Sequence, residues 1–126
     1  MTQIYSDGTY FESNPRWHEE DSHWKAAQIQ KMINRNSLVP RNIAEIGCGA
    51  GEILNQLSKS FTGVEFSGYE ISSQAFELCK GRSLPNLSFF LQDLLEDNTA
   101  FFDIVMAIDV IERVSKILCK SQIKLI

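Results

Sequence analysis

The stretch Glu45-Ile46-Gly47-Cys48-Gly49-Ala50-Gly51 decides the fold, because it joins an apolar segment to an amphipathic one through three closely spaced glycines. Residues 42–46 are typical of a short buried strand, and Ile53, Leu54 and Leu57 follow the turn at helical spacing. Glycine tolerates positive φ and has no Cβ that would obstruct a ligand approaching the backbone. The helix that begins near Gly51 directs unpaired N–H groups toward the space above the loop. The sequence therefore predicts a strand, a glycine turn and a helix, with a ligand at the turn.

The chain on both sides of this turn continues to alternate strands and helices. We predict strands over residues 64–71, 87–91 and 101–108, the last of them apolar on both faces, as in a strand buried between two helical layers. Between the first two, Ser72 or Ser73 caps a helix that carries Ala75, Phe76 and Leu78, with Gly81 just past its end. This order predicts a Rossmann-like, three-layer α/β/α fold around a mostly parallel sheet.

Residues 1–41 are expected to form an irregular arm followed by a helix, and residues 42–126 to form the core. The helix begins at Asp21 or Ser22, and its inner face carries Ala26, Ile29, Met32 and Ile33. The arm contains Trp17, His18, His23 and Trp24, which could form a lid over the site, with a histidine as base, or could simply pack the arm onto the sheet. The histidines stand five residues apart, and paired helical metal ligands stand four apart, so we expect no metal.

Composition limits the classes of function. The 126 residues suit one domain, and 12 basic against 16 acidic residues give a net charge of −4 without a broad basic face, which argues against nucleic acid. The most apolar stretch, residues 101–111, contains Asp103 and Asp109 and is too short for a membrane span, and residues 1–20 lack the apolar run of a signal peptide. Three cysteines, whose spacing matches no zinc or redox motif, are expected to be reduced in a cytoplasmic protein.

The spacing of the glycines discriminates between two classes of ligand. Dinucleotide-binding turns read G-x-G-x-x-G, and here the third glycine position of that motif is occupied by Glu52, an anion where a pyrophosphate would lie. The observed pattern is G-x-G-x-G, with Glu45 two residues before the first glycine. Both the spacing and the charge therefore disfavour a dinucleotide.

With Glu45-x-Gly47-x-Gly49-x-Gly51 in view, the sequence resembles the class I methyltransferases that use S-adenosylmethionine. Glu70 matches the acidic residue that ends their second strand, and Asp93 the one that ends their third. Residues 102–105 and 109–114 resemble their fourth-strand segment, in which many members read D-V-I-E-H-V. The resemblance covers about residues 42–114 with the motifs in order, and it implies S-adenosylmethionine as the cofactor.

The resemblance also implies a role for each matching residue. The cofactor-binding residues would be Glu45, Gly47, Cys48, Gly49, Gly51, Glu70, Ile71, Asp93, Leu94 and Asp109. Loop N–H groups suit the cofactor's carboxylate and Glu45 its ammonium, whereas Glu70 would accept from the ribose hydroxyls and Asp93 from the adenine amino group. Asp109 and His18 are the candidate catalytic residues, with His23 as a further candidate base. Arg113 stands where the family often has histidine.

The family core has seven strands, and this sequence supplies four. We therefore expect a C-terminally truncated member whose sheet is incomplete at that edge and could self-associate there. The expected function is methyl transfer to a small-molecule acceptor. The alternative is a non-catalytic or remnant S-adenosylmethionine-binding module without the acceptor-binding half.

Overall fold

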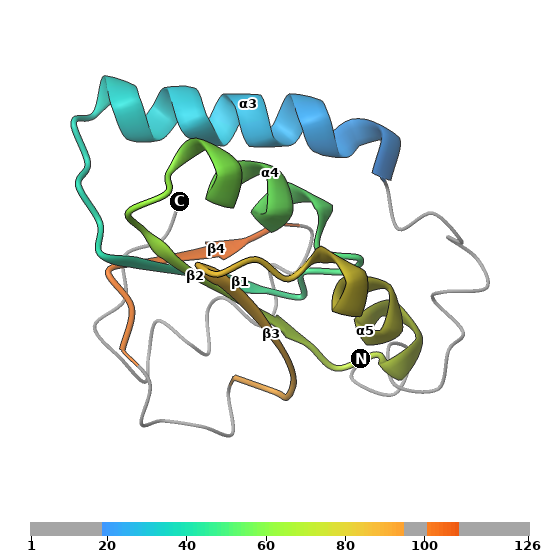
Figure 1. The fold of residues 1–126 in the computed structure, drawn as a ribbon. Coiled ribbons are helices and arrows are strands. Elements are labelled where there is room, and N and C mark those ends of the chain that lie inside the picture. Colours follow the sequence, from blue (N-terminus) through green and yellow to red (C-terminus); the bar gives the residue numbers. More distant parts are fainter. Residues whose placement is uncertain (1–18, 95–100, 109–126) are drawn as a thin grey trace.

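A computed structural model describes residues 19–94 and 101–108 of the chain. It contains three α-helices, one 3₁₀ turn and four strands within these residues (Figure 1). In chain order they are α3 (Glu19–Arg35), β1 (Asn42–Ile46), α4 (Glu52–Ser60), β2 (Glu65–Glu70), α5 (Ser73–Cys79), η1 (Lys80–Arg82), β3 (Leu87–Leu91) and β4 (Ile104–Ala107).

The strands form one parallel sheet in the order β3-β2-β1-β4. Ile46 at the end of β1 pairs with Tyr69 on one side and with Ala107 on the other, and Glu70 pairs with Leu91. The carboxyl ends of all four strands therefore lie at the same edge of the sheet. This arrangement confirms the predicted Rossmann-like α/β fold with a parallel sheet.

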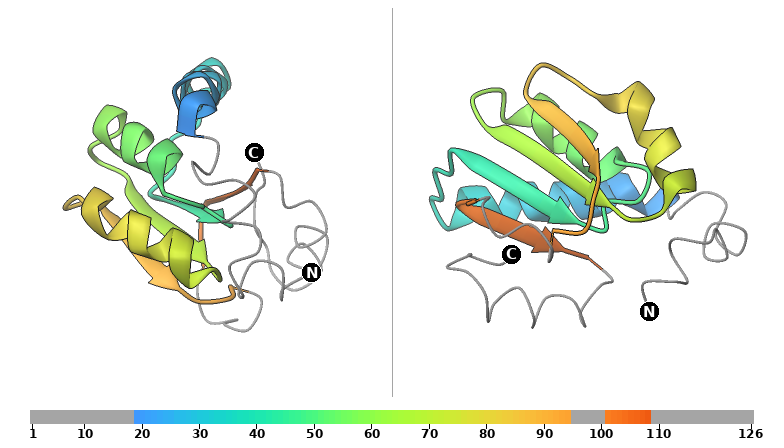
Figure 2. Two further views of the ribbon diagram at one scale, coloured as in Figure 1. Left: turned by 90° about the vertical axis from the view of Figure 1, so that its right-hand side faces the viewer. Right: turned by 90° about the horizontal axis from the view of Figure 1, so that it is seen from below.

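The three helices cover one face of this sheet (Figure 2). On that face, Ile29 and Ile33 of α3 and Leu54 and Leu57 of α4 pack against strand side chains such as Phe66 in a single buried cluster. The alternate strand residues form a second cluster on the opposite face together with Leu94, which follows β3; its strand members are Ala44, Ile46, Tyr69 and Val105. The described residues place no helix on that opposite face, and the expected incomplete edge beyond β4 lies outside them.

Two details of the predicted N-terminal helix were wrong. The helix α3 begins at Glu19, before the expected cap, and Met32 is 43% exposed instead of buried. At about 100° per residue, Met32 lies about 60° around the helix from Ile29, at the border of the apolar face. Gly81 lies just past the end of α5, as expected, and it has no positive φ because the chain continues there into the 3₁₀ turn η1.

The predicted strand over residues 101–108 is shorter than expected, since β4 spans Ile104–Ala107. The start of β4 is tied to the start of β1 by side chains. The Arg41 N–H donates to Asp103 Oδ2 at 2.7 Å, and the Asp103 N–H donates to Asn42 Oδ1 at 2.8 Å. Among the described helices, none has the length and apolar character needed to cross a membrane.

Candidate functional site

The candidate site lies at the carboxyl edge of the sheet, where the register brings the ends of the strands together. Gly47 follows β1, Ile71 follows β2, and Gln92 and Asp93 follow β3. The crevice outside the carboxyl ends of parallel strands, where the strand order reverses, is the usual ligand site of open α/β sheets. Here that reversal falls at β1, which lies between β2 and β4.

The glycine turn between β1 and α4 needs glycine at three positions. Gly47, Gly49 and Gly51 have φ values of 65°, 58° and 80°, in the left-handed region that side chains with a Cβ rarely adopt. The N–H groups of Gly47 and Cys48 both donate to the Tyr69 carbonyl, at 2.8 and 3.2 Å. The turn is therefore folded back onto the end of β2.

Glu70 connects the end of β2 to this turn. Its Oε1 atom accepts from the Gly49 N–H at 2.8 Å, and its Oε2 atom accepts from the N–H groups of Ile71 at 3.0 Å and Ser72 at 2.9 Å. The side chain is 3% exposed. An ionised carboxylate only accepts hydrogen bonds, so this ring of N–H donors suits Glu70 in its charged form.

Two cysteine thiols lie against the same turn. Cys79 at the end of α5 donates from Sγ to the Gly49 carbonyl at 3.0 Å, and Cys48 Sγ lies 4.0 Å from that oxygen. The pKa of the Cys48 thiol is raised well above its ordinary value, first by its hydrogen bond with Cys79, then by burial and by the charges of Glu45 and Glu70. Cys48 is therefore a neutral thiol, a poor nucleophile.

The third glycine packs against an aromatic ring. A Cβ on Gly51 would lie 2.6 Å from the ring of Phe89 on β3, and a Cβ on Gly68 of β2 would lie 2.7 Å from the same ring. The absence of side chains at these two positions allows Phe89 to lie beneath the start of α4. Gly51 thus serves both the backbone conformation and the packing of the turn.

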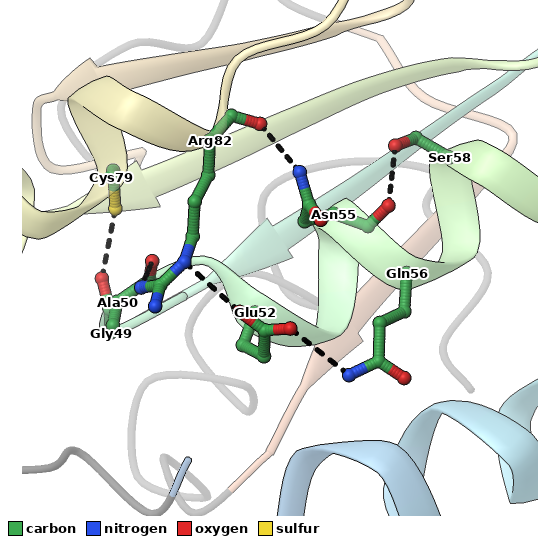
Figure 3. A network of polar contacts seen from close by, with 8 residues as sticks. All are labelled: Gly49, Ala50, Glu52, Asn55, Gln56, Ser58, Cys79 and Arg82. Atoms are coloured by element: carbon green, nitrogen blue, oxygen red, sulfur yellow. Dashed lines mark hydrogen bonds and ion pairs between the residues drawn. The ribbon is translucent and has the colours of Figure 1, made fainter.

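The first turn of α4 has no side-chain cap, since Gly51 is the N-cap residue. Glu52 in this turn forms an ion pair with Arg82, with 3.0 Å between Oε2 and Nε, and accepts from Gln56 at 3.2 Å (Figure 3). Arg82 therefore compensates part of the Glu52 charge on which the sequence argument against a dinucleotide relied. The argument from glycine spacing is unaffected.

A comparison with the sequence models of known families identifies the family to which this site belongs. The sequence model of the methyltransferase domain matches residues 44–122, which include the glycine turn and all the described strands except the first two residues of β1. The chain belongs to the methyltransferase domain family.

Solved structures agree with this methyltransferase domain in fold. The plantazolicin methyltransferase BpumL, crystallised with a monoazolic desmethylPZN analog and SAH, superposes with a TM-score of 0.69 at 19% identity, over 99% of this chain and 52% of that one. The magnesium protoporphyrin IX methyltransferase ChlM from Synechocystis PCC 6803, with bound SAH, gives a TM-score of 0.59 at 20% identity, over 81% and 49%. The methyltransferase domain of bacterial CtHen1 gives 0.59 at 19% identity, over 80% and 57%.

This methyltransferase domain spans about half the length of these structures. None of the curated protein sequences matches it.

Most of the predicted cofactor-binding residues of this methyltransferase domain lie together at the carboxyl edge. Glu45 is 2% exposed near the end of β1, Asp93 is half-buried after β3, and the Leu94 side chain is buried in the second cluster. The remaining candidates are less favourable or not described. His23 and Trp24 are exposed on α3, whereas Trp17, His18, Asp109 and Arg113 lie outside the described residues.

Sequence reasoning missed two residues that hold the turn, Cys79 and Arg82. Cys79 is buried and donates from Sγ to the Gly49 carbonyl. Neither residue belongs to a motif, and about 30 residues separate each from its partner in the turn. Over residues 19–94 and 101–108, no three His, Cys, Asp or Glu side chains are grouped so that they could hold a metal ion.

Proposed function

We propose that this chain binds S-adenosylmethionine at the glycine turn and transfers its methyl group to a small-molecule acceptor. The observation that carries the proposal is the pairing of a left-handed G-x-G-x-G turn with a buried acidic residue on the neighbouring strand end, Glu70. A turn of this kind brings backbone groups, an uncapped helix start and a carboxylate to one point at the sheet edge.

The residues at this point match the chemistry of the cofactor. The uncapped N-terminus of α4 suits a carboxylate, because its N–H groups and the helix dipole favour negative charge. Glu45 and the carbonyl groups of the turn suit the ammonium group. An ionised carboxylate only accepts hydrogen bonds, and Glu70 stands at the end of β2 beside the turn, so its carboxylate would accept from the ribose hydroxyls. Asp93 and the Leu94 N–H would bind the adenine.

The protein's contribution to the reaction is chiefly positioning. When bound, S-adenosylmethionine supplies an electrophilic methyl group for an in-line displacement by an O, N or C nucleophile. Holding two reactants in line can lower the activation barrier by roughly 7–11 kcal/mol. A rigid turn that fixes the cofactor would therefore contribute to catalysis. A general base is required only for an acceptor that must lose a proton, and His18, His23 and Asp109 remain the candidates.

The proposed class of acceptor is supported by similar structures and by charge. Two of the similar structures are a plantazolicin methyltransferase and a magnesium protoporphyrin IX methyltransferase. The net charge of −4 does not favour nucleic acid. The reduced cysteines predicted from the sequence support a cytoplasmic location, and Cys48 and Cys79 are free thiols.

A second candidate is a cofactor-binding module that does not transfer methyl groups. The observation that favours it is the coverage of about half of each similar structure, since residues that bind the acceptor in a whole enzyme can lie in the other half. The module would bind the cofactor at the same site as the proposed methyltransferase, but it would not transfer the methyl group.

Isothermal titration tests the shared step. We expect the folded chain to bind S-adenosylhomocysteine with 1:1 stoichiometry and not to bind NAD⁺. Glu70→Gln should weaken binding at least tenfold, whereas Glu77→Gln, on the exposed side of α5, should leave it unchanged. Absence of saturable binding to folded wild-type protein would overturn both candidates, and binding without methyl transfer to an acceptor panel would favour the module.

A further inference from the structure

Arg82, the last residue of the 3₁₀ turn η1 that follows α5, contacts the glycine turn. Its Nη1 atom donates to the Ala50 carbonyl at 2.6 Å, and its Nε atom lies 3.0 Å from Glu52 Oε2 (Figure 3). One guanidinium therefore joins two points that flank Gly51, the last glycine of the turn. The planar guanidinium has donors in a fixed fork, which allows it to bind two acceptors at once.

The backbone that carries Arg82 is fixed in return by α4. Asn55 donates from Nδ2 to the Arg82 carbonyl at 2.8 Å, and one turn later Ser58 donates from Oγ to the Asn55 carbonyl at 2.9 Å. Cys79, three residues before Arg82, donates to the Gly49 carbonyl. The end of α5 and η1 thus hold two successive carbonyl groups of the turn, those of Gly49 and Ala50.

The contact of Arg82 with the turn has consequences beyond the stability that its ion pair with Glu52 contributes. The side chains of Arg82 and Glu52 are 25% and 23% exposed, and a partly exposed ion pair contributes little stability alone. However, Glu52 lies in the first turn of α4, where its negative charge would oppose an anionic ligand if it were not compensated. The bond to Ala50 also fixes the direction of the peptide groups that such a ligand would meet.

We propose that Arg82 is a positioning residue for the amino-acid end of the cofactor. It holds the Ala50 carbonyl so that the turn is pre-organised, and it neutralises Glu52 beside the helix N-terminus that receives the cofactor's carboxylate. Pre-organisation of this kind raises affinity because less order is lost on binding. The inference rests on the proposed function, since it assigns that carboxylate to the start of α4.

The affinities of two ligands distinguish a positioning role of Arg82 from a general structural role. S-adenosylhomocysteine carries the amino-acid end, and 5′-methylthioadenosine has the same adenosine without it. For Arg82→Gln we expect the Kd of S-adenosylhomocysteine to rise about tenfold, equivalent to about 1.4 kcal/mol, while the Kd of 5′-methylthioadenosine changes less than about twofold. The double variant Glu52→Gln/Arg82→Gln should recover part of the loss, because it removes the uncompensated charge.

Lys80→Gln is the matched control, because it removes one positive charge two residues away from an exposed pair with Glu77. It should change neither Kd. If Arg82→Gln fails to fold, Arg82→Lys keeps the charge and loses the fork, and it should give a smaller loss with the same selectivity. Equal weakening of both ligands, or of neither, would overturn the inference while leaving the proposed function standing. If wild-type protein does not bind S-adenosylhomocysteine, the proposed function fails, and this inference fails with it.

Discussion

The backbone N–H of Gly49 donates to Glu70 Oε1 at 2.8 Å, although 21 residues separate the two in sequence. This bond joins the middle of the glycine turn to the end of the neighbouring strand. The two motifs that resemble the methyltransferase family are therefore one physical unit in this fold. A change at either residue should affect both the stability of the turn and the ligand it holds.

Glu70→Gln tests this unit in the unfolding equilibrium. Glutamine has nearly the same shape, but its amide nitrogen is a donor and would face a backbone N–H donor. Hydrogen bonds to charged groups contribute about 1.5–3 kcal/mol each, so we expect the free energy of unfolding to fall by about 2–3 kcal/mol. Urea denaturation followed by circular dichroism measures this change. A loss below about 0.5 kcal/mol, as expected for a surface change such as Glu77→Gln, would show that Glu70 does not hold the turn.

Gly51→Ala should be strongly destabilising. A Cβ there would lie 2.6 Å from the Phe89 ring at a φ of 80°. Left-handed strain and overpacking each cost about 1–3 kcal/mol, so a loss of at least 2 kcal/mol is expected in the free energy of unfolding. Gly63→Ala is the control, since a Cβ at Gly63 meets nothing within 4 Å, and it should be nearly neutral. Similar unfolding midpoints for the two variants in urea would contradict the described packing of the turn.

Cys48 should give the protein a specific alkaline instability. Its pKa is raised in the fold, so the thiol stabilises the folded state fully below its ordinary pKa, and this stability is lost as the pH rises through the raised folded value. Native protein should also react with iodoacetamide at Cys48 much more slowly than denatured protein. We expect Cys48→Ala to flatten the decline of the unfolding free energy as the pH rises above the ordinary thiol pKa. An unchanged pH profile in this variant would show that Cys48 is not the group responsible.

Asp103 should give the opposite pH dependence at the other end of the strands. Its pKa is lowered first by the hydrogen bond from the Arg41 N–H, and also by the charge of Arg41. A lowered folded pKa means that the stabilisation is present above the ordinary carboxyl value and is lost as the pH falls through the folded value. Acid titration of the unfolding midpoint should therefore show a smaller decline in Asp103→Asn than in the wild type. Identical acid profiles would contradict this assignment.

Much of the fold could be predicted from the sequence, because its signals are local. Leu87–Leu91 was predicted to the residue, since Pro85 precedes it and a polar pair follows it. Ser72 was a predicted cap and accepts from the Ala75 N–H at 3.4 Å. The error at Met32 arose where packing, which is not a local pattern, decided which side chains are buried.

The motifs of the candidate site could be predicted from the sequence, but the residues that hold the glycine turn in place could not. The glycines and Glu70 have a fixed spacing that a single sequence displays. Arg82 and Cys79 reach the turn only because α5 packs beside α4, and the resulting bonds to Ala50 and Gly49 leave no sequence pattern. The compensation of Glu52 by Arg82 is likewise a property of the fold and leaves no sequence pattern.

The most direct test of the central claim is a ¹H–¹⁵N correlation spectrum of the labelled chain titrated with S-adenosylhomocysteine. We predict saturable shifts of the amide signals of Gly47, Gly49, Gly51 and Ile71, while that of Gly63, which is exposed beyond the other end of α4, stays in place. A folded spectrum in which the turn amides do not respond, or in which the shifts centre elsewhere, would contradict the assignment of this site to the cofactor.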